Sequence, residues 1–129
     1  MVEKLSSRSE LRGFFEIADA WGLTTEQQRA LLNIRTKTTL RAWRATGAAR
    51  LGMDRLERVT SVLVIHECLH SLLPSDEAES WIWRDNDHPL FGGSPPIVRM
   101  ASGVVGLVRT RLYLEGLLGS KADSRQVHE

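Results

Sequence analysis

Apolar residues recur every three or four positions along most of the chain, which is the spacing of amphipathic α-helices. The first such segment covers residues 7–21 and stops at Gly22. Its apolar positions are Leu11, Phe14, Phe15, Ala18 and Trp21. A glycine directly after the last apolar position is a common helix end. The pattern therefore predicts an amino-terminal helix with one buried face.

Two shorter helices are predicted next, within residues 24–34 and 36–46. Thr24 or Thr25 can cap the first of them, and Thr25 with Gln28 matches the capping box, in which a threonine and a glutamine bond each other's backbone. Thr36 is the expected cap of the second. That helix should direct Leu40 and Trp43 inward and end at Gly47.

A long helix is predicted over residues 54–73, because Asp54 stands near its start and Pro74 follows its end. Pro74 is the expected boundary between an amino-terminal domain, residues 1–74, and a carboxyl-terminal domain, residues 75–129.

The second half should hold a short helix at 77–83, an irregular loop at 85–93, a short helix opening at Pro95 and a final helix at 103–118. Gly119 is expected to end the last helix and leave a mobile polar tail. No segment alternates as a β-strand would. The fold class is therefore all-α, a helix-turn-helix bundle followed by a small helical domain.

Charge is unevenly distributed, although the net charge is only +1. Residues 24–58 hold eight basic and three acidic side chains, whereas residues 75–129 hold six basic and eight acidic ones. This asymmetry favours two different partners. A single cysteine, Cys68, excludes an internal disulfide and fits a reducing compartment. Neither a signal peptide nor a membrane span is evident, so a cytoplasmic location is expected.

The two short helices and the turn between them match a helix-turn-helix pattern, and the second helix is basic. In DNA-binding examples the amino-terminal residues of the second helix contact base edges in the major groove. Lys37, Thr38 and Arg41 are the candidates for such contacts. Arg35 and Arg44 are the candidates for phosphates. An ordinary three-helix core with a solvated basic face is the alternative interpretation.

Other polar groupings give weaker indications. His66 and His70 lie one helical turn apart, but Cys68 would point away from them, so no metal site is expected. Asp85, Asp87 and His88 lack a converging partner for acid–base catalysis. The Gly92–Gly93 pair lacks the lysine of a phosphate loop. We therefore expect neither catalytic residues nor a cofactor.

The second half resembles the toxin-binding domain of the Xre/MbcA/ParS antitoxins, over residues 79–119. The matching positions are Trp81, Asn86, Leu90, Gly93, Ser94, Pro95, Gly103 and the closing LEGLLG. His88 and Phe91 are departures from that pattern. Residues 23–44 are similar to the family's Xre-like helix-turn-helix, and residues 54–73 resemble its linking helix.

This resemblance implies an antitoxin whose partner is a toxin of the RES fold, an enzyme that consumes NAD. It further implies that the antitoxin blocks the toxin's active-site cleft, and that the complex, a homodimer or a hetero-oligomer with toxin, represses its own promoter. The toxin contacts we expect are Tyr113, Leu117, Leu118, Lys121 and Arg125, with the rest of residues 121–129.

Trp81, Asn86, Leu90 and Pro95 are then expected to hold the carboxyl-terminal domain together, and residues 89–96, PLFGGSPP, to form a rigid turn. Two alternatives remain at this point. The chain could be a plain transcription regulator whose carboxyl-terminal helices only dimerise, or an enzyme that uses the Asp/His loop.

Overall fold

The computed structural model describes residues 2–47 and 50–127, with side chains placed for residues 8–47 and 50–122. Every regular element in this part of the chain is helical, which confirms the all-α fold class. The elements are α1 (Val2–Trp21), α2 (Thr25–Leu32), α3 (Lys37–Thr46), α4 (Gly52–Leu72), α5 (Ser75–Ser80), the 3-10 turn η1 (Trp81–Trp83), α6 (Pro96–Met100) and α7 (Val104–Val127). None of these helices combines the length and the apolar composition needed to cross a membrane.

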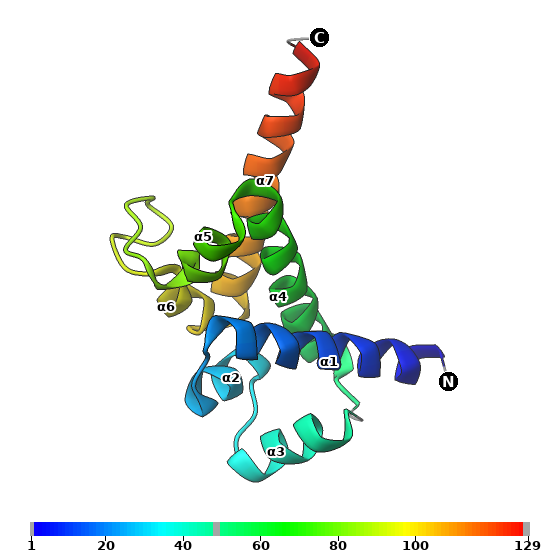
Figure 1. Cartoon of the computed structure of the whole chain (residues 1–129). Helices are drawn as coiled ribbons and strands as arrows, with labels where there is room; N and C mark the ends of the chain where they lie inside the picture. Colours follow the sequence, from blue (N-terminus) through cyan, green and yellow to red (C-terminus); the bar gives the residue numbers. More distant parts are fainter. Residues whose placement is uncertain (1, 48–49, 128–129) are drawn as a thin grey trace.

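The helix α1 crosses the lower part of the bundle, and α2 and α3 lie beneath it (Figure 1). Its buried face includes Leu11, Phe14 and Ala18, which are fully enclosed. It ends at Gly22, which has a left-handed φ of 68°, so the predicted end is confirmed. The predicted start at residue 7 is wrong, because the helix already begins at Val2.

Threonine side chains cap the starts of the two short helices, α2 and α3. Thr24 caps α2 by accepting from the Gln27 amide, and the Gln27 side chain accepts from the Thr24 amide. The predicted pairing of Thr25 with Gln28 is therefore wrong by one position. Gln28 is instead buried and donates to the Leu23 carbonyl. For α3 the predicted limits are confirmed, since Thr36 caps its start and the left-handed Gly47 ends it.

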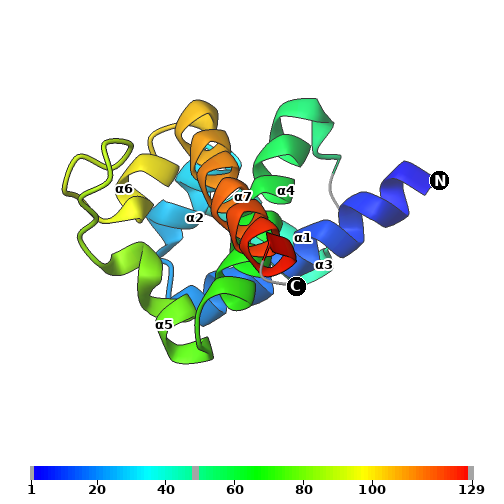
Figure 2. The same ribbon diagram turned by 90° about the horizontal axis from the view of Figure 1, so that it is seen from above.

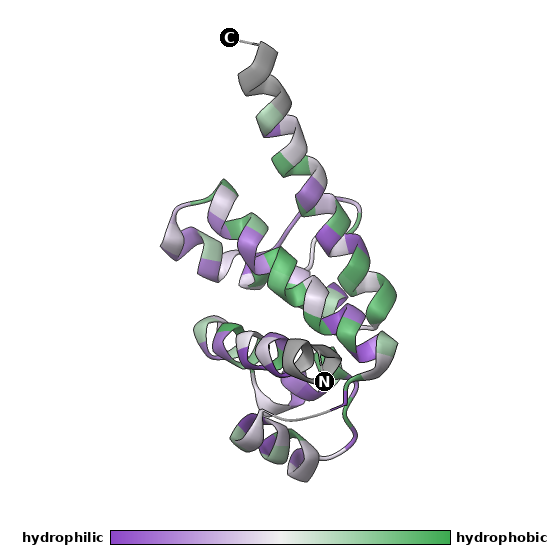
Figure 3. Cartoon of the chain, turned by 90° about the vertical axis from the view of Figure 1, so that its right-hand side faces the viewer, coloured by the Kyte–Doolittle hydropathy of each residue, from purple (hydrophilic) through white to green (hydrophobic). Residues whose placement is uncertain are grey.

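The helix α4 lies at the centre of the molecule, packed between α1 and α7 (Figures 1 and 2). Its buried apolar side chains, among them Val59, Val62 and Ile65, belong to one continuous core with residues of both halves of the chain. Green and purple residues alternate along the helices in Figure 3, as expected where each buries one face. The core thus spans the boundary expected at Pro74.

The carboxyl-terminal elements depart from the predicted limits in three places. The expected helix at 77–83 is α5 followed by the 3-10 turn η1. Pro95 caps α6 and Pro96 is its first residue, so the prediction for Pro95 is wrong by one position. Gly119 does not end the last helix, and no mobile tail starts there, because α7 continues to Val127. Residues 128 and 129 of the expected tail lie outside the described residues.

Candidate DNA-binding and partner-binding surfaces

The two surfaces expected from the sequence lie at opposite ends of the molecule. The helix α3 is at the lower end in Figures 1 and 3, and the carboxyl end of α7 projects from the upper end. A partner bound at one end therefore leaves the other accessible.

The turn between α2 and α3 is built to hold a fixed angle. Asn33 takes the left-handed conformation, with φ 56°, that a four-residue connection requires. Its neighbour Ile34 is buried and anchors the turn in the core. The helix-turn-helix shape thus comes from one left-handed residue and one apolar anchor.

Three arginines of the basic residues 24–58 donate hydrogen bonds to backbone carbonyls at the carboxyl end of α2. Arg55 donates to the Leu32 and Asn33 carbonyls at 3.2 and 3.0 Å. Arg58, almost fully buried, donates to two carbonyls in the last turn of α2 at 3.3 and 3.4 Å. Arg29 reaches the Ile34 carbonyl. These three cations stabilise the turn, because helix ends leave such carbonyls without partners.

Two further basic residues are paired with carboxylates. Arg44 binds Asp19 of α1 through two hydrogen bonds of 2.8 and 3.1 Å, and this pairing lowers the pKa of the Asp19 carboxyl. Lys37 lies 3.6 Å from Glu26 of α2. A DNA phosphate would have to replace a carboxylate at Arg44, which was expected to be a phosphate contact.

The remaining cations of the stretch, Arg35, Arg41 and Arg50, are exposed and form no salt bridge with any side chain that the structure describes. Thr38 is also exposed, on the first turn of α3. The structure thus brings Thr38 and Arg41 to the outer surface of the second helix, where the sequence placed them.

The expected toxin contacts on α7 fall into two groups. Tyr113 packs on His88, with ring centroids 4.3 Å apart, and Leu118 packs against the core. Leu117 is 41% exposed, and Lys121 donates weakly to the Ser71 carbonyl at 3.4 Å. The side chain of Arg125 lies outside the described part. Leu117 is therefore more accessible to a partner than Tyr113 or Leu118.

Sequence reasoning missed three exposed apolar residues near these positions. Val98 of α6, Val105 and Leu112 of α7 are more than half exposed. Val105 and Leu112 are seven residues apart and so share one side of the helix. The apolar pattern of α7 is wider than one buried face needs, which indicates that some apolar residues are exposed. The pattern alone does not show which side of the helix the bundle covers.

The PLFGGSPP segment folds as a compact loop around Asn86. The backbone amide of Asn86 donates to the Ser94 carbonyl, and the backbone carbonyl of Asn86 accepts from the Gly93 amide. Both Gly92 and Gly93 have positive φ, which a side chain would disfavour. Phe91, the departure from the family pattern, is buried between Trp81 and Tyr113.

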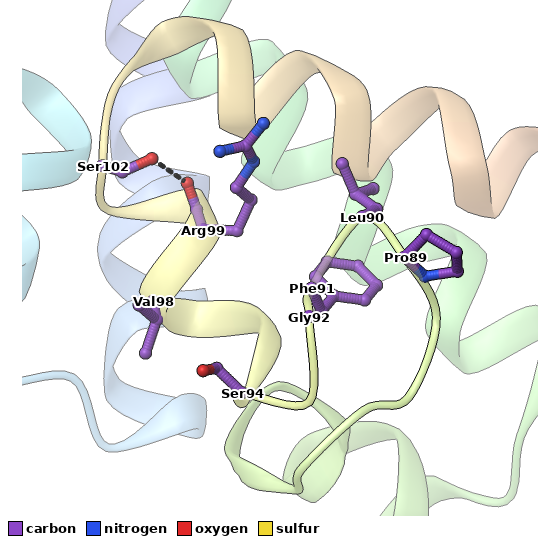
Figure 4. Close-up of a pocket in the computed structure, with 8 residues that line it drawn as sticks. All are labelled: Pro89, Leu90, Phe91, Gly92, Ser94, Val98, Arg99 and Ser102. Atoms are coloured by element: carbon purple, nitrogen blue, oxygen red, sulfur yellow. Dashed lines mark hydrogen bonds between the residues drawn. The ribbon is translucent and has the colours of Figure 1, made fainter.

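One open depression lies between this loop and α6 (Figure 4). The side chains or backbone of eight residues line it, namely Pro89, Leu90, Phe91, Gly92, Ser94, Val98, Arg99 and Ser102. Most of this lining is apolar or backbone, and Arg99 is its one ionisable residue. The depression presents no converging acid–base pair.

The comparisons with known proteins agree with this arrangement. Residues 2–63 match the family of the antitoxin Xre-like helix-turn-helix domain. Residues 2–63 thus form an antitoxin Xre-like helix-turn-helix domain. The match spans α1, α2, α3 and about half of α4, so it includes the whole turn described above.

The Xre-like chain is also 36% identical, over 113 residues, to a protein of Sinorhizobium fredii (strain NBRC 101917 / NGR234) named uncharacterized protein y4oB. The similarity covers 86% of this chain and 85% of the relative. It therefore extends well beyond the helix-turn-helix domain into the carboxyl-terminal helices.

Proposed function

We propose that this Xre-like protein is the antitoxin of a type II toxin–antitoxin pair. In this proposal its carboxyl-terminal helices bind and inhibit a RES-domain toxin of the MbcA/ParS-associated kind, by covering the NAD-consuming active site. Its helix-turn-helix represses the operon that encodes both proteins. The observation that carries the proposal is the Xre-like antitoxin domain at one end of a molecule whose other end is a projecting helix.

DNA binding is supported by the outer surface of α3. Arg41 and Thr38 are exposed on a helix whose angle is fixed by the Asn33 turn, and Arg35 flanks them. A guanidinium in this position can donate two hydrogen bonds to one guanine. We propose Lys37, Thr38 and Arg41 as base contacts, and Arg35 and Arg44 as phosphate contacts.

The test is binding of the Arg41→Ala variant to the chain's own promoter and to random DNA. We expect promoter binding to weaken by about 1–3 kcal/mol and random binding to weaken less, because only the promoter contact reads a base. Arg84→Ala, which removes an exposed arginine far along the chain, is the charge-matched control. Equal losses on both DNAs would reduce Arg41 to a phosphate contact, and absence of promoter binding with and without toxin would refute repression.

Toxin binding is supported by the exposure and charge of the carboxyl-terminal part. Leu117 is accessible on a helix that leaves the bundle, and residues 75–129 carry two more acidic than basic side chains. A cleft that binds a dinucleotide usually presents positive charge, so this excess favours association. We propose that Leu117, Lys121 and Arg125 contact the toxin directly, and that Tyr113 and Leu118 support them from the helix flank.

Co-expression with the toxin tests this role. A chain truncated after Gly119 should keep its fold, because every core residue among the described side chains precedes that point, but it should no longer restore growth. Leu117→Asp should also weaken neutralisation, whereas Met53→Asp, at a 90% exposed position on α4, should not. Full rescue by both the truncated chain and Leu117→Asp would place the inhibitory surface elsewhere.

A plain transcription regulator is the second candidate, and the exposed Val105 and Leu112 favour it as a dimer contact. If this alternative holds, Leu112→Glu should convert a dimer to a monomer in solution and no toxin should copurify. A neighbouring reading frame of the RES type would favour the antitoxin role instead.

A further inference from the structure

A cluster of three ionisable side chains joins the two halves of the chain. His66 and His70 are on α4, and Glu79 is on α5, beyond the Pro74 turn. The Nε2 atom of His66 lies 3.0 Å from Glu79 Oε1, and the Nε2 atom of His70 contacts the same oxygen. Each of the three side chains is between 27% and 30% exposed, so the cluster is sheltered but open to solvent on one side.

The backbone makes this convergence specific. The two histidines are four residues apart and therefore share one side of α4, with ring centroids 4.3 Å apart. Cys68, between them in sequence, is buried in the core on another side of the helix. His66 also lies against the Trp21 ring, at 5.9 Å, which limits its rotation. The helix α5 thus brings Glu79 to the pair as a third candidate ligand, which the sequence did not indicate.

The polar atoms of the cluster are only partly satisfied. Both imidazoles contact Oε1 of Glu79. The other oxygen, Oε2, is buried without a hydrogen-bond partner among the described residues. A buried carboxylate oxygen without a partner is costly. A cation between the three groups would accept electron pairs from both imidazoles and from the carboxylate, and it would neutralise the charge of that carboxylate.

The dimensions fit a tetrahedral metal ion. One ligand atom from each residue lies within 4.8 Å of the other two. Zinc bonds to nitrogen and oxygen of about 2.0–2.1 Å place neighbouring ligand atoms about 3.3 Å apart. The distance of 3.0 Å between His66 Nε2 and Glu79 Oε1 needs only a small shift, and the closer contact of His70 Nε2 with that oxygen has to open further. Two imidazoles with one carboxylate suit zinc, and they do not suit magnesium or calcium, which prefer oxygen ligands.

We propose that His66, His70 and Glu79 form a binding site for a divalent transition metal ion of the zinc class, with water at the fourth position. The segment His66–Glu67–Cys68–Leu69–His70 has the H-E-x-x-H spacing by which one helix presents two histidines to zinc. We infer binding alone, since hydrolysis would also need a substrate cleft beside Glu67. The bound ion would tie α5 to α4, and so clamp the carboxyl-terminal helices onto the Xre-like part.

Titration of the full-length, tag-free and metal-free protein with zinc chloride tests the proposal. Calorimetry should show one ion per chain, and zinc should raise the thermal unfolding midpoint, because an ion that binds only the folded state stabilises it. Magnesium at the same concentration should not. Absence of zinc binding to the full chain would overturn the proposal.

Two ligand variants and one control locate the site. His70→Gln and Glu79→Gln should each weaken zinc binding at least about tenfold, since even partners of ligands contribute that much, and His88→Gln, in the distant loop, should bind as the wild type does. Cobalt substitution gives a second measurement, because a tetrahedral site with nitrogen ligands produces a visible absorption that His70→Gln should abolish. Undiminished zinc binding by folded His70→Gln and Glu79→Gln proteins would overturn the proposal. If a variant fails to fold, the cobalt spectrum of the wild type decides between a tetrahedral nitrogen-ligated site and none.

Discussion

Arginines in this chain serve two different purposes that composition does not separate. Arg58 is buried and bonds to Asp54 and to the end of α2, whereas Arg41 is exposed on α3. Both count equally toward the basic excess of residues 24–58. The surface proposed to bind DNA is therefore less basic than the sequence suggested, and fewer exposed side chains are available for contacts there.

Replacing Arg58 tests whether its guanidinium stabilises the turn between α2 and α3. Arg58→Met keeps the apolar stem but removes the guanidinium, which leaves carbonyls at the end of α2 and the Asp54 carboxylate without their partner. We expect the free energy of unfolding to fall by about 1–3 kcal/mol, the cost of buried polar groups without hydrogen bonds. Urea denaturation measures the change. Arg50→Met, at an exposed position, should leave stability within about 0.5 kcal/mol of wild type. Equal stability of the two variants would contradict the role of Arg58 in holding the turn.

At the scale of the elements, the sequence predicted most helices but fewer of their limits. Gly22 and Gly47 end helices because each adopts a left-handed conformation there. Gly119 does not, since glycine permits that conformation without requiring it. The capping box shifted by one position because Thr24 and Thr25 are equally suitable residues, and only the observed backbone selects Thr24.

The candidate surfaces were predictable to a different extent. The exposed positions on α3 followed from helical spacing, because they depend only on local structure. Glu79 could not be assigned to the histidine pair, since the contact depends on how the chain reverses at Pro74. Likewise the packing of Tyr113 against His88 and Phe91 could not be predicted, because it depends on how their loop folds back onto α7.

The packing of α6 on α7 gives a sharp test at this scale. A Cβ atom at Gly106 would lie 2.2 Å from the Arg99 carbonyl oxygen, whereas one at Gly116 would meet nothing within 4 Å. Gly106→Ala should therefore destabilise the protein by about 1–3 kcal/mol, the usual cost of overpacking. Gly116→Ala should stabilise it by about 0.5–1 kcal/mol, because alanine favours an exposed helix interior. Denaturation midpoints measure both, and a stable Gly106→Ala protein would show that α6 can move away from α7.

For the whole molecule, the two halves share their core and their polar contacts. The Trp83 indole donates to the Trp21 carbonyl at 2.8 Å, and Arg111 of α7 bonds to Glu57 and Ser61 of α4. The helix α4 thus belongs structurally to both ends of the chain. We expect the molecule to unfold as one unit, even though the two ends are proposed to bind different partners.

A fragment and the whole chain test this expectation together. The full chain should show one transition, with far-ultraviolet circular dichroism and tryptophan fluorescence changing at the same denaturant concentration. Residues 1–74 alone should lack a cooperative transition, because removing α7 uncovers the apolar side of α4. Two separate transitions of the full chain, or a cooperatively folded fragment, would show that the boundary at Pro74 separates independent domains.

Because α7 is uninterrupted, the orientation of its projecting end about the helix axis is fixed relative to the bundle. The helix runs without a break from its packed contact with α4 to Val127, so its projecting end has a set azimuth relative to the bundle. Each residue of an α-helix turns the chain by about 100° and advances it by about 1.5 Å. Deleting Ser120 would therefore rotate every later side chain by more than a quarter turn while shortening the helix very little. The direction in which each side chain of that end faces therefore depends on the number of residues before it as well as on its identity.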